Sequence, residues 1–250
     1  MLRRGFLRGL TAGSAITLCT SLAAGRLAYA DDFDVPVGRA SADSAVWRGL
    51  IKDSGANVRV AASTDADIVA ELQPGDPVEI DGWVAGTEIY PSVITWGHMA
   101  DRRGYVYGSA LRPRLPDTPP GLPPDSQAWS GNWIDVNLTQ NVIAAYEGQT
   151  IRGLFPTSPG RPGLETTRGT HRVRYQVPVQ DMSGPGYYIR GVQWISYFLP
   201  DGQAIHARTW DLNAISLGVP ASHGCLGVSS DAAAFLYTFA SPGTPVYVHD

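Results

Sequence analysis

The sequence predicts a mainly β protein in two parts, a small β-barrel followed by a larger β-rich domain with one helix. Three observations lead to this expectation: short alternating apolar segments over residues 46–111, a proline-rich stretch at 112–125, and a single convincing helical pattern near the C-terminus. The chain has 250 residues, of which 44% are hydrophobic, so it can form one large domain or two ordinary ones and bury a substantial core.

The first 30 residues have the pattern of an export signal. Paired arginines, Arg3 and Arg4, precede an apolar stretch and the small-residue site Ala28-Tyr29-Ala30, as in twin-arginine signal peptides. We therefore expect residues 1–30 to be cleaved and the protein to be exported to the periplasm or cell-wall space. An uncleaved anchor is disfavoured because the apolar run is shorter than the roughly 20 residues of a spanning helix. No stable membrane span is expected after cleavage.

Charge and cysteine content argue against two kinds of partner. Without residues 1–30 the chain keeps 15 basic and 23 acidic residues, a formal net charge of −8, so nucleic acid is not expected to bind. Cys19 lies in the signal, which leaves Cys225 alone. One cysteine with scattered histidines cannot complete a tetrahedral zinc site, and no metal is expected. Since exported proteins usually pair their cysteines, a lone thiol is either buried and inert or present to react.

Residues 46–111 read as the short strands of a small, partly open β-barrel. Asn57-Val58-Arg59 belongs to an alternating stretch, and Pro74-Gly75-Asp76 forms a turn between apolar runs. With Trp83, Trp96 and Gly104-Tyr105-Val106-Tyr107, these features resemble a bacterial SH3-like domain, which we place at residues 44–112. The resemblance implies a module that binds the cell wall or packs on a neighbouring catalytic domain.

A proline-rich linker is expected at residues 113–128. The stretch RPRLPDTPPGLPPD holds six prolines in fourteen residues and favours an extended conformation, so it can serve as a semi-rigid spacer. The second domain then occupies residues 131–249. Residues 133–146 read as a hairpin, RGTHRVRYQV as a strand, YYIRGVQWISYFL as a buried strand pair and TPVYVH as a final strand. The helix is expected over Ser229–Ala240, with a serine cap, Asp231 in its first turn and a stop before Ser241-Pro242-Gly243.

The segment Ser222-His223-Gly224-Cys225 contains the candidate catalytic residues. A cysteine attacks as its thiolate and needs a neighbouring base, for which His223, two residues earlier, and His206, nineteen residues earlier, are the candidates. Gly224 permits a tight backbone approach, so the amides around Gly224 and Cys225 can point at a developing oxyanion. These parts are suited to acyl transfer through a thioester. The alternative is that Cys225 is a small buried hydrophobe.

The spacing of His206, fifteen residues and then Ser222-His223-Gly224-Cys225 is similar to the signature of the L,D-transpeptidase catalytic domain, the YkuD-type fold. The similarity extends over about residues 132–248. It implies that Cys225 is the nucleophile, that His206 is the base, and that the backbone carbonyl of Ala207 orients the imidazole. By the same resemblance His223 and Gly224 line the oxyanion region with Cys225, and Ser222 supports the turn.

Members of this family act on peptidoglycan in cell-wall biogenesis and the maintenance of cell shape. They cleave the bond between the diamino acid and D-alanine of a tetrapeptide stem and pass the acyl group from a thioester to an amine, which gives a 3-3 cross-link. The resemblance therefore implies peptidoglycan stem peptides as partners and no cofactor. The chain departs from the usual pattern at four places. Gly227 occupies a position at which the family usually has Asn or Arg, and the resemblance implies that residue 227 contacts the substrate. In addition, Ala207 replaces Ser or Gly, Trp210-Asp211 replaces Trp-His, and Thr167 replaces Pro.

Two other functions remain open from the sequence. In cell-wall cysteine peptidases of the NlpC type the histidine follows the cysteine, and here only His249 does so. A non-catalytic cell-wall binding protein with a decayed site would not need to keep both His206 and Cys225. The acceptor amine, the diamino acid of the stem and the oligomeric state are not indicated by the sequence.

Overall fold

The computed structural model describes residues 46–90, 93–101, 103–115, 129–208 and 217–250. The expected signal peptide, most of the expected linker and the Trp210-Asp211 pair lie outside these ranges. In the described ranges the chain is mainly β, as predicted, and contains one α-helix. Within the same ranges no helix is long and apolar enough to cross a membrane.

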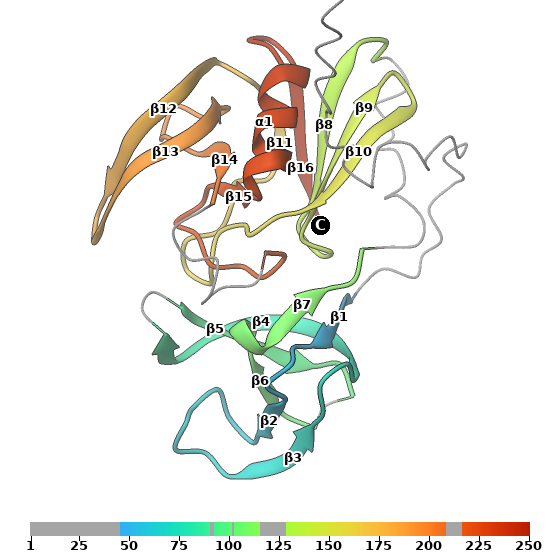
Figure 1. The fold of residues 1–250 in the computed structure, drawn as a ribbon, viewed down its shortest axis with the longest axis vertical. Coiled ribbons are helices and arrows are strands. Elements are labelled where there is room, and N and C mark those ends of the chain that lie inside the picture. Colours follow the sequence, from blue (N-terminus) through green and yellow to red (C-terminus); the bar gives the residue numbers. More distant parts are fainter. Residues whose placement is uncertain (1–45, 91–92, 102, 116–128, 209–216) are drawn as a thin grey trace, which may run out of the picture.

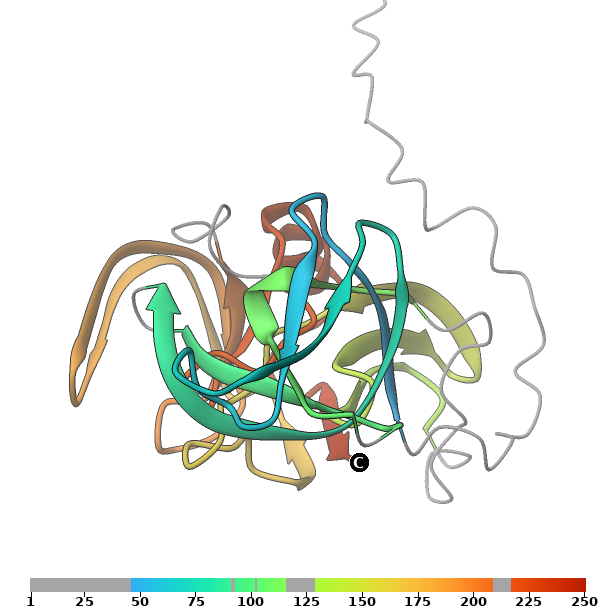
Figure 2. The ribbon, with the colours of Figure 1, turned by 90° about the horizontal axis from the view of Figure 1, so that it is seen from below.

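The first part is one antiparallel sheet of seven strands in the order β3-β2-β6-β5-β4-β1-β7. The sheet is strongly curved (Figure 2). Trp47, Ile51 and Leu111 are fully buried in its core. The SH3-like assignment of this part stays a prediction. The strands are β1 (Trp47–Ile51), β2 (Ala56–Arg59), β3 (Ile68–Leu72), β4 (Pro77–Tyr90), β5 (Val93–Met99), β6 (Tyr105–Tyr107) and β7 (Leu111–Pro113), with the 3-10 turn η1 (Gly108–Ala110) before β7.

The second part has two sheets with a helix beside them (Figure 1). The first sheet has the order β10-β9-β8-β16-β11 and the second the order β12-β13-β14-β15. The elements are β8 (Asn132–Asn137), β9 (Val142–Glu147), β10 (Thr150–Pro156), β11 (Gly169–Arg172), β12 (Tyr175–Gly184), β13 (Tyr187–Tyr197), β14 (Ala204–Ala207), β15 (Leu226–Val228), α1 (Ser230–Phe239) and β16 (Pro245–His249).

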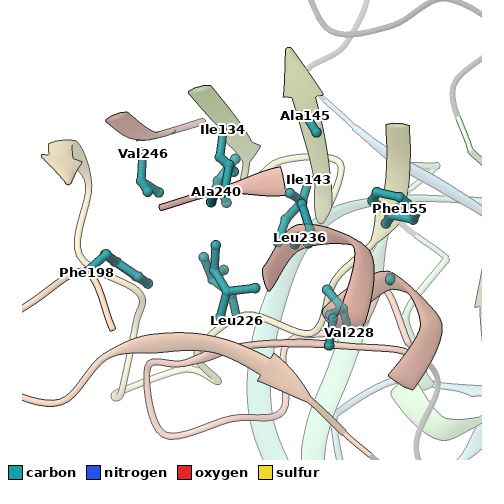
Figure 3. Packing of buried hydrophobic residues seen from close by; sticks show 14 of the residues in the cluster. Ile134, Ile143, Ala145, Phe155, Phe198, Leu226, Val228, Leu236, Ala240 and Val246 are labelled. Carbon is teal, nitrogen blue, oxygen red and sulfur yellow. The ribbon is translucent and has the colours of Figure 1, made fainter. Parts of the chain in front are cut away.

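The main core of this part lies between the two sheets and the helix (Figure 3). Ile134 and Val246 come from the first sheet, Leu226 and Val228 from the second, and Leu236 from α1; all five side chains are almost completely buried. Burial of such side chains from three elements stabilises the domain by roughly 1.5–3 kcal/mol for each one. This core fixes the inner face of β15, the strand that follows Cys225.

The helix begins and ends close to its predicted limits. Ser229 is the N-cap, and its side chain accepts a hydrogen bond from the backbone N–H of Ala232, while Asp231 lies in the first turn. The helix ends at Phe239, immediately before the Ser241-Pro242-Gly243 stretch. Local capping chemistry, which the sequence displays directly, is sufficient to place this element.

Two strand predictions for residues 168–199 were wrong. RGTHRVRYQV forms two strands in different sheets, because the chain leaves β16 at Val173 and joins β13 at Arg174, where the Arg174 N–H donates to the Tyr197 carbonyl. YYIRGVQWISYFL is not a buried strand pair but mostly the single strand β13, whose first half is largely exposed. With β12 it forms a long hairpin that extends away from the rest of the sheet (Figure 1).

The two parts pack directly against each other, so the linker does not hold them apart as a spacer. Val219, from the second part, belongs to the buried core of the first. The Thr95 hydroxyl of β5 donates to the Pro220 carbonyl at 2.5 Å, and the Asn141 amide donates to the Gly218 carbonyl at 3.0 Å. The segment just before Ser222 is therefore fixed from both sides.

Candidate active site

The centre of the site is the parallel pairing of β14 with β15. Ile205 pairs with Leu226 and His206 with Gly227, so Cys225 directly precedes the paired stretch. Because side chains alternate along a strand, Ile205 and Leu226 face the core while His206 and Cys225 share the opposite face. The structure thus brings together two residues that are nineteen positions apart in the sequence.

His206 is held in one orientation by the backbone. Its side chain is buried, and Nδ1 lies 2.8 Å from the carbonyl oxygen of Ala207. A carbonyl oxygen only accepts hydrogen bonds, so Nδ1 carries the hydrogen, and in the neutral ring Nε2 is then the nitrogen that can take up a proton. This is the tautomer that a general base requires.

The Ser222-His223-Gly224-Cys225 turn is closed by its own serine. The Ser222 hydroxyl donates to the Cys225 carbonyl at 2.6 Å and accepts from the Gly224 N–H at 3.0 Å. Gly224 has φ +116°, a conformation that L side chains rarely adopt. The Gly224 amide is therefore occupied by Ser222, and it does not point toward a developing oxyanion as the sequence suggested.

A buried threonine supports the same turn from outside it. The Thr166 hydroxyl accepts from the Gly160 N–H at 3.0 Å and donates to the Gly224 carbonyl at 2.9 Å. Thr166 is 2% exposed, so water does not compete for these groups. Gln203 packs on the other side, where a Cβ on Gly224 would lie 3.2 Å from its side chain. The turn thus has one fixed geometry.

Cys225 is half-buried beneath the β12–β13 hairpin. Its Sγ donates to the Gly202 carbonyl at 3.7 Å, and its side chain packs with the apolar cluster that includes Tyr187 and Tyr197. Desolvation raises the pKa of the thiol to about 11. The thiol is therefore protonated at neutral pH, and a base would have to remove its proton before the sulfur could react as a thiolate.

His223 is not placed to act as that base. An Arg161 guanidinium N–H donates to His223 Nε2 at 3.2 Å, which occupies the lone pair, and the ring lies 4.4 Å from the ring of Tyr187. Burial, followed by the charges of Arg161 and Arg208, lowers the pKa of His223. The imidazole is held neutral and lines the site between Arg161 and the hairpin. His206 remains the residue with a base's geometry.

The chain is similar to known proteins over its second part. Residues 131–248 match the model of the YkuD family, the L,D-transpeptidase catalytic domain. The probable L,D-transpeptidase 3 of Mycobacterium tuberculosis is 29% identical over 110 residues, which is 39% of this chain and 39% of the relative.

Solved structures give further matches. An L,D-transpeptidase from Mycobacterium smegmatis matches with 23% identity and a TM-score of 0.44, over 48% of this chain and 58% of that one. L,D-transpeptidase 3 from Mycobacterium tuberculosis matches with 21% identity and a TM-score of 0.44, over 48% of this chain and 61% of that one. The chain spans about two fifths of the curated relative and about three fifths of these solved chains.

Several residues around Cys225 were missed by the sequence interpretation. Thr166, Arg161 and Tyr187 come from distant segments, and no local pattern marks them. Arg208 did have a signal: it follows His206 by two residues, directly after β14, and its N–H continues the pairing with β15, so both side chains are expected on the same face. Gly227, predicted as a substrate contact, pairs with His206 and lies under the Arg208 side chain.

A cavity of about 290 Å³ lies between the first and second parts of the chain. Gly160, Thr166 and Pro220 line it from the catalytic side, and Asp81 and Trp83 line it from β4. The residues that hold the Ser222–Cys225 turn therefore also face the first part. In the described ranges no three His, Cys, Asp or Glu side chains gather as they would around a metal ion.

Proposed function

We propose that this protein is a peptidoglycan L,D-transpeptidase in which Cys225 is the nucleophile and His206 the base. The observation that carries the proposal is the β14–β15 register, which places both residues on one polar face, with His206 Nδ1 hydrogen-bonded to the Ala207 carbonyl. The match of residues 131–248 to the YkuD family supports the same reaction.

The reaction follows from the protonation states. His206 Nε2 takes the proton from Sγ, and the thiolate attacks the carbonyl carbon of the bond between the diamino acid and D-alanine. The tetrahedral intermediate collapses, the amine of D-alanine leaves with the proton from His206, and a thioester remains on Cys225. An amine of a second stem then attacks the thioester, His206 again takes and returns a proton, and a 3-3 cross-link forms.

This chemistry fits an exported protein. A thioester conserves the energy of the cleaved amide, so the transfer needs no nucleotide and no cofactor. We propose that residues 1–30 direct the chain to the periplasm or cell-wall space, on the basis of the Arg3-Arg4 pair and the Ala28-Tyr29-Ala30 site. We also propose that the first part is an SH3-like module whose role is to pack on the catalytic domain, since Val219 is inserted in its core.

The alternative of an NlpC-type peptidase would need His249 as the base. His249 lies in β16, in the other sheet, and its Nε2 is 3.0 Å from the buried carboxylate of Asp135. Its Nδ1 donates to the backbone carbonyl of Asp250. Both nitrogens are thus engaged away from Cys225, which argues against that mechanism.

The proposal is tested by intact-protein mass spectrometry of the full chain mixed with a tetrapeptide stem that ends in D-alanine. The expected result is a tripeptide adduct on the wild type, release of D-alanine, and no adduct on Cys225→Ala. Adding a second stem should discharge the adduct and produce a 3-3 dimer. A folded wild-type protein that forms no adduct and releases no D-alanine would refute the proposal.

A further inference from the structure

Arg208 is unusual among the charged residues of this chain. It is 5% exposed, and no other arginine in the described ranges is buried. Its backbone N–H donates to the Val228 carbonyl at 2.8 Å, which extends the β14–β15 pairing by one residue. Because His206 and Arg208 are two apart, both side chains lie on the face that carries Cys225.

Gly227 provides the space that Arg208 uses. A Cβ atom on Gly227 would lie 3.0 Å from Cδ of Arg208 and 3.3 Å from its Cβ, closer than nearly all real contacts of this kind. A Cβ atom at position 227 would therefore require the Arg208 side chain to shift by a few tenths of an ångström. The glycine at position 227 leaves room for the Arg208 side chain, so the positive charge on this face comes from the residue that directly follows β14.

The Arg208 charge acts on the reacting groups. It lowers the pKa of the Cys225 thiol and the pKa of His223. Desolvation is the largest influence on Cys225 and acts in the opposite direction, as does the negative charge of Asp201. Arg208 is thus the cation that opposes the burial of the thiol.

The other titratable groups around the thiol do not supply that charge. Tyr187 and Tyr197, from β13, have raised pKa values, chiefly because they are buried, so they remain neutral. His223 is neutral for the reasons given above. Arg161 is engaged by His223, and His206 Nδ1 is engaged by the Ala207 carbonyl.

We propose that Arg208 is a positioning residue of the active site, whose guanidinium stabilises the Cys225 thiolate and reaches it across the space left open by Gly227. When Sγ gives its proton to His206 Nε2, the new thiolate and imidazolium form an ion pair, and Arg208 favours the anionic member of that pair. The consequence for acyl transfer rests on the proposed function, whereas the effect on the thiol does not.

The thiol is probed directly by its rate of alkylation with iodoacetamide as a function of pH, on the full chain. Arg208→Met keeps the length of the side chain and removes its charge. Loss of a unit charge next to a partly buried thiol is expected to shift the pKa of the thiol by about one unit, so about tenfold less thiolate should form at a given pH. Arg208→Lys should retain most of the effect. Arg152→Ala, an exposed arginine paired with Glu147, serves as the control.

Two further variants separate charge from structure. Gly227→Ala leaves Arg208 in the chain but forces its side chain to shift, so the pKa of the thiol should rise, by less than in Arg208→Met; this test stands even if Arg208→Met fails to fold. The double variant Arg208→Met/Gly227→Arg places a positive charge on the neighbouring strand β15 instead, and it should restore much of the alkylation rate. A thiol pKa that is unchanged in both Arg208→Met and Gly227→Ala would overturn the proposal.

The tetrapeptide assay distinguishes this failure from failure of the proposed function. If the wild type forms the acyl adduct while Arg208→Met alters neither the pKa of the thiol nor the rate of adduct formation, the role of Arg208 is wrong and the function stands. If the pH dependence of alkylation shifts as expected but neither the wild type nor any variant is acylated, the role of Arg208 stands and the proposed function is wrong.

Discussion

Replacement of Thr166 by valine tests how much the Thr166 hydroxyl contributes to the stability of the Ser222–Cys225 turn. Valine has nearly the same shape as threonine, so Thr166→Val leaves no large cavity, but it removes the hydroxyl that links the Gly160 N–H to the Gly224 carbonyl. The site is buried, so both backbone groups lose their partner. Each unsatisfied buried group costs about 1–3 kcal/mol, which gives an expected loss of about 2–6 kcal/mol in the free energy of unfolding.

This loss is a large share of the roughly 5–15 kcal/mol by which domains are stable, so it is measurable by urea unfolding. The rate of acyl adduct formation should fall as well, since the turn that carries Cys225 loses its outer support. Thr166→Ser keeps the hydroxyl and should retain most of both properties. Thr238→Val, on an exposed face of α1, is the matched control and should change stability by less than about 0.5 kcal/mol. A loss below about 1 kcal/mol for Thr166→Val would refute the argument.

Three other predictions follow from the same structure. His206→Gln should lower the rate of acylation by about 10²–10⁴-fold at neutral pH with the fold unchanged, and wild-type turnover would remove His206 as the base. Alkylation of Cys225 in the absence of substrate should rise with pH throughout the neutral range and level off near pH 11, because burial raises the pKa of the thiol to about 11; a plateau already present at pH 7 would show a preformed thiolate. Val219→Ala should destabilise the full chain by about 1–2 kcal/mol in thermal or urea unfolding, because two buried methyl groups are lost, and an unchanged midpoint would show that the contact between the two parts does not contribute.

The elements with local signals could be predicted from the sequence. The hairpin β8–β9 follows from its turn at residues 139–141, and α1 follows from the Ser229 cap and Asp231. By contrast, alternation in RGTHRVRYQV indicates a strand but does not say with which strand it pairs. The break at Val173 depends on hydrogen bonds to residues far along the chain, such as the one to Thr244.

The site divides in the same way. His206 and Cys225 could be named because their spacing matches a known signature, whereas Arg208 was missed although it lies only two residues after His206. Thr166 could not be found, since it bonds to a residue 58 positions away and its own neighbourhood is unremarkable. The occupied Gly224 amide was also missed, because whether Ser222 turns toward its own loop depends on packing that the sequence does not display.

The insertion of Val219 in the core of the first part bears on how such proteins can be recombined. A module that replaced the first part would have to offer a pocket for Val219 and a donor for the Pro220 carbonyl, or the residues leading into Ser222 would lose their anchor. The catalytic domain cut out alone would expose Val219 to water. Dividing the chain at the proline-rich linker would therefore break the contacts of Val219 and Pro220 with the first part, although the linker is where the sequence composition changes.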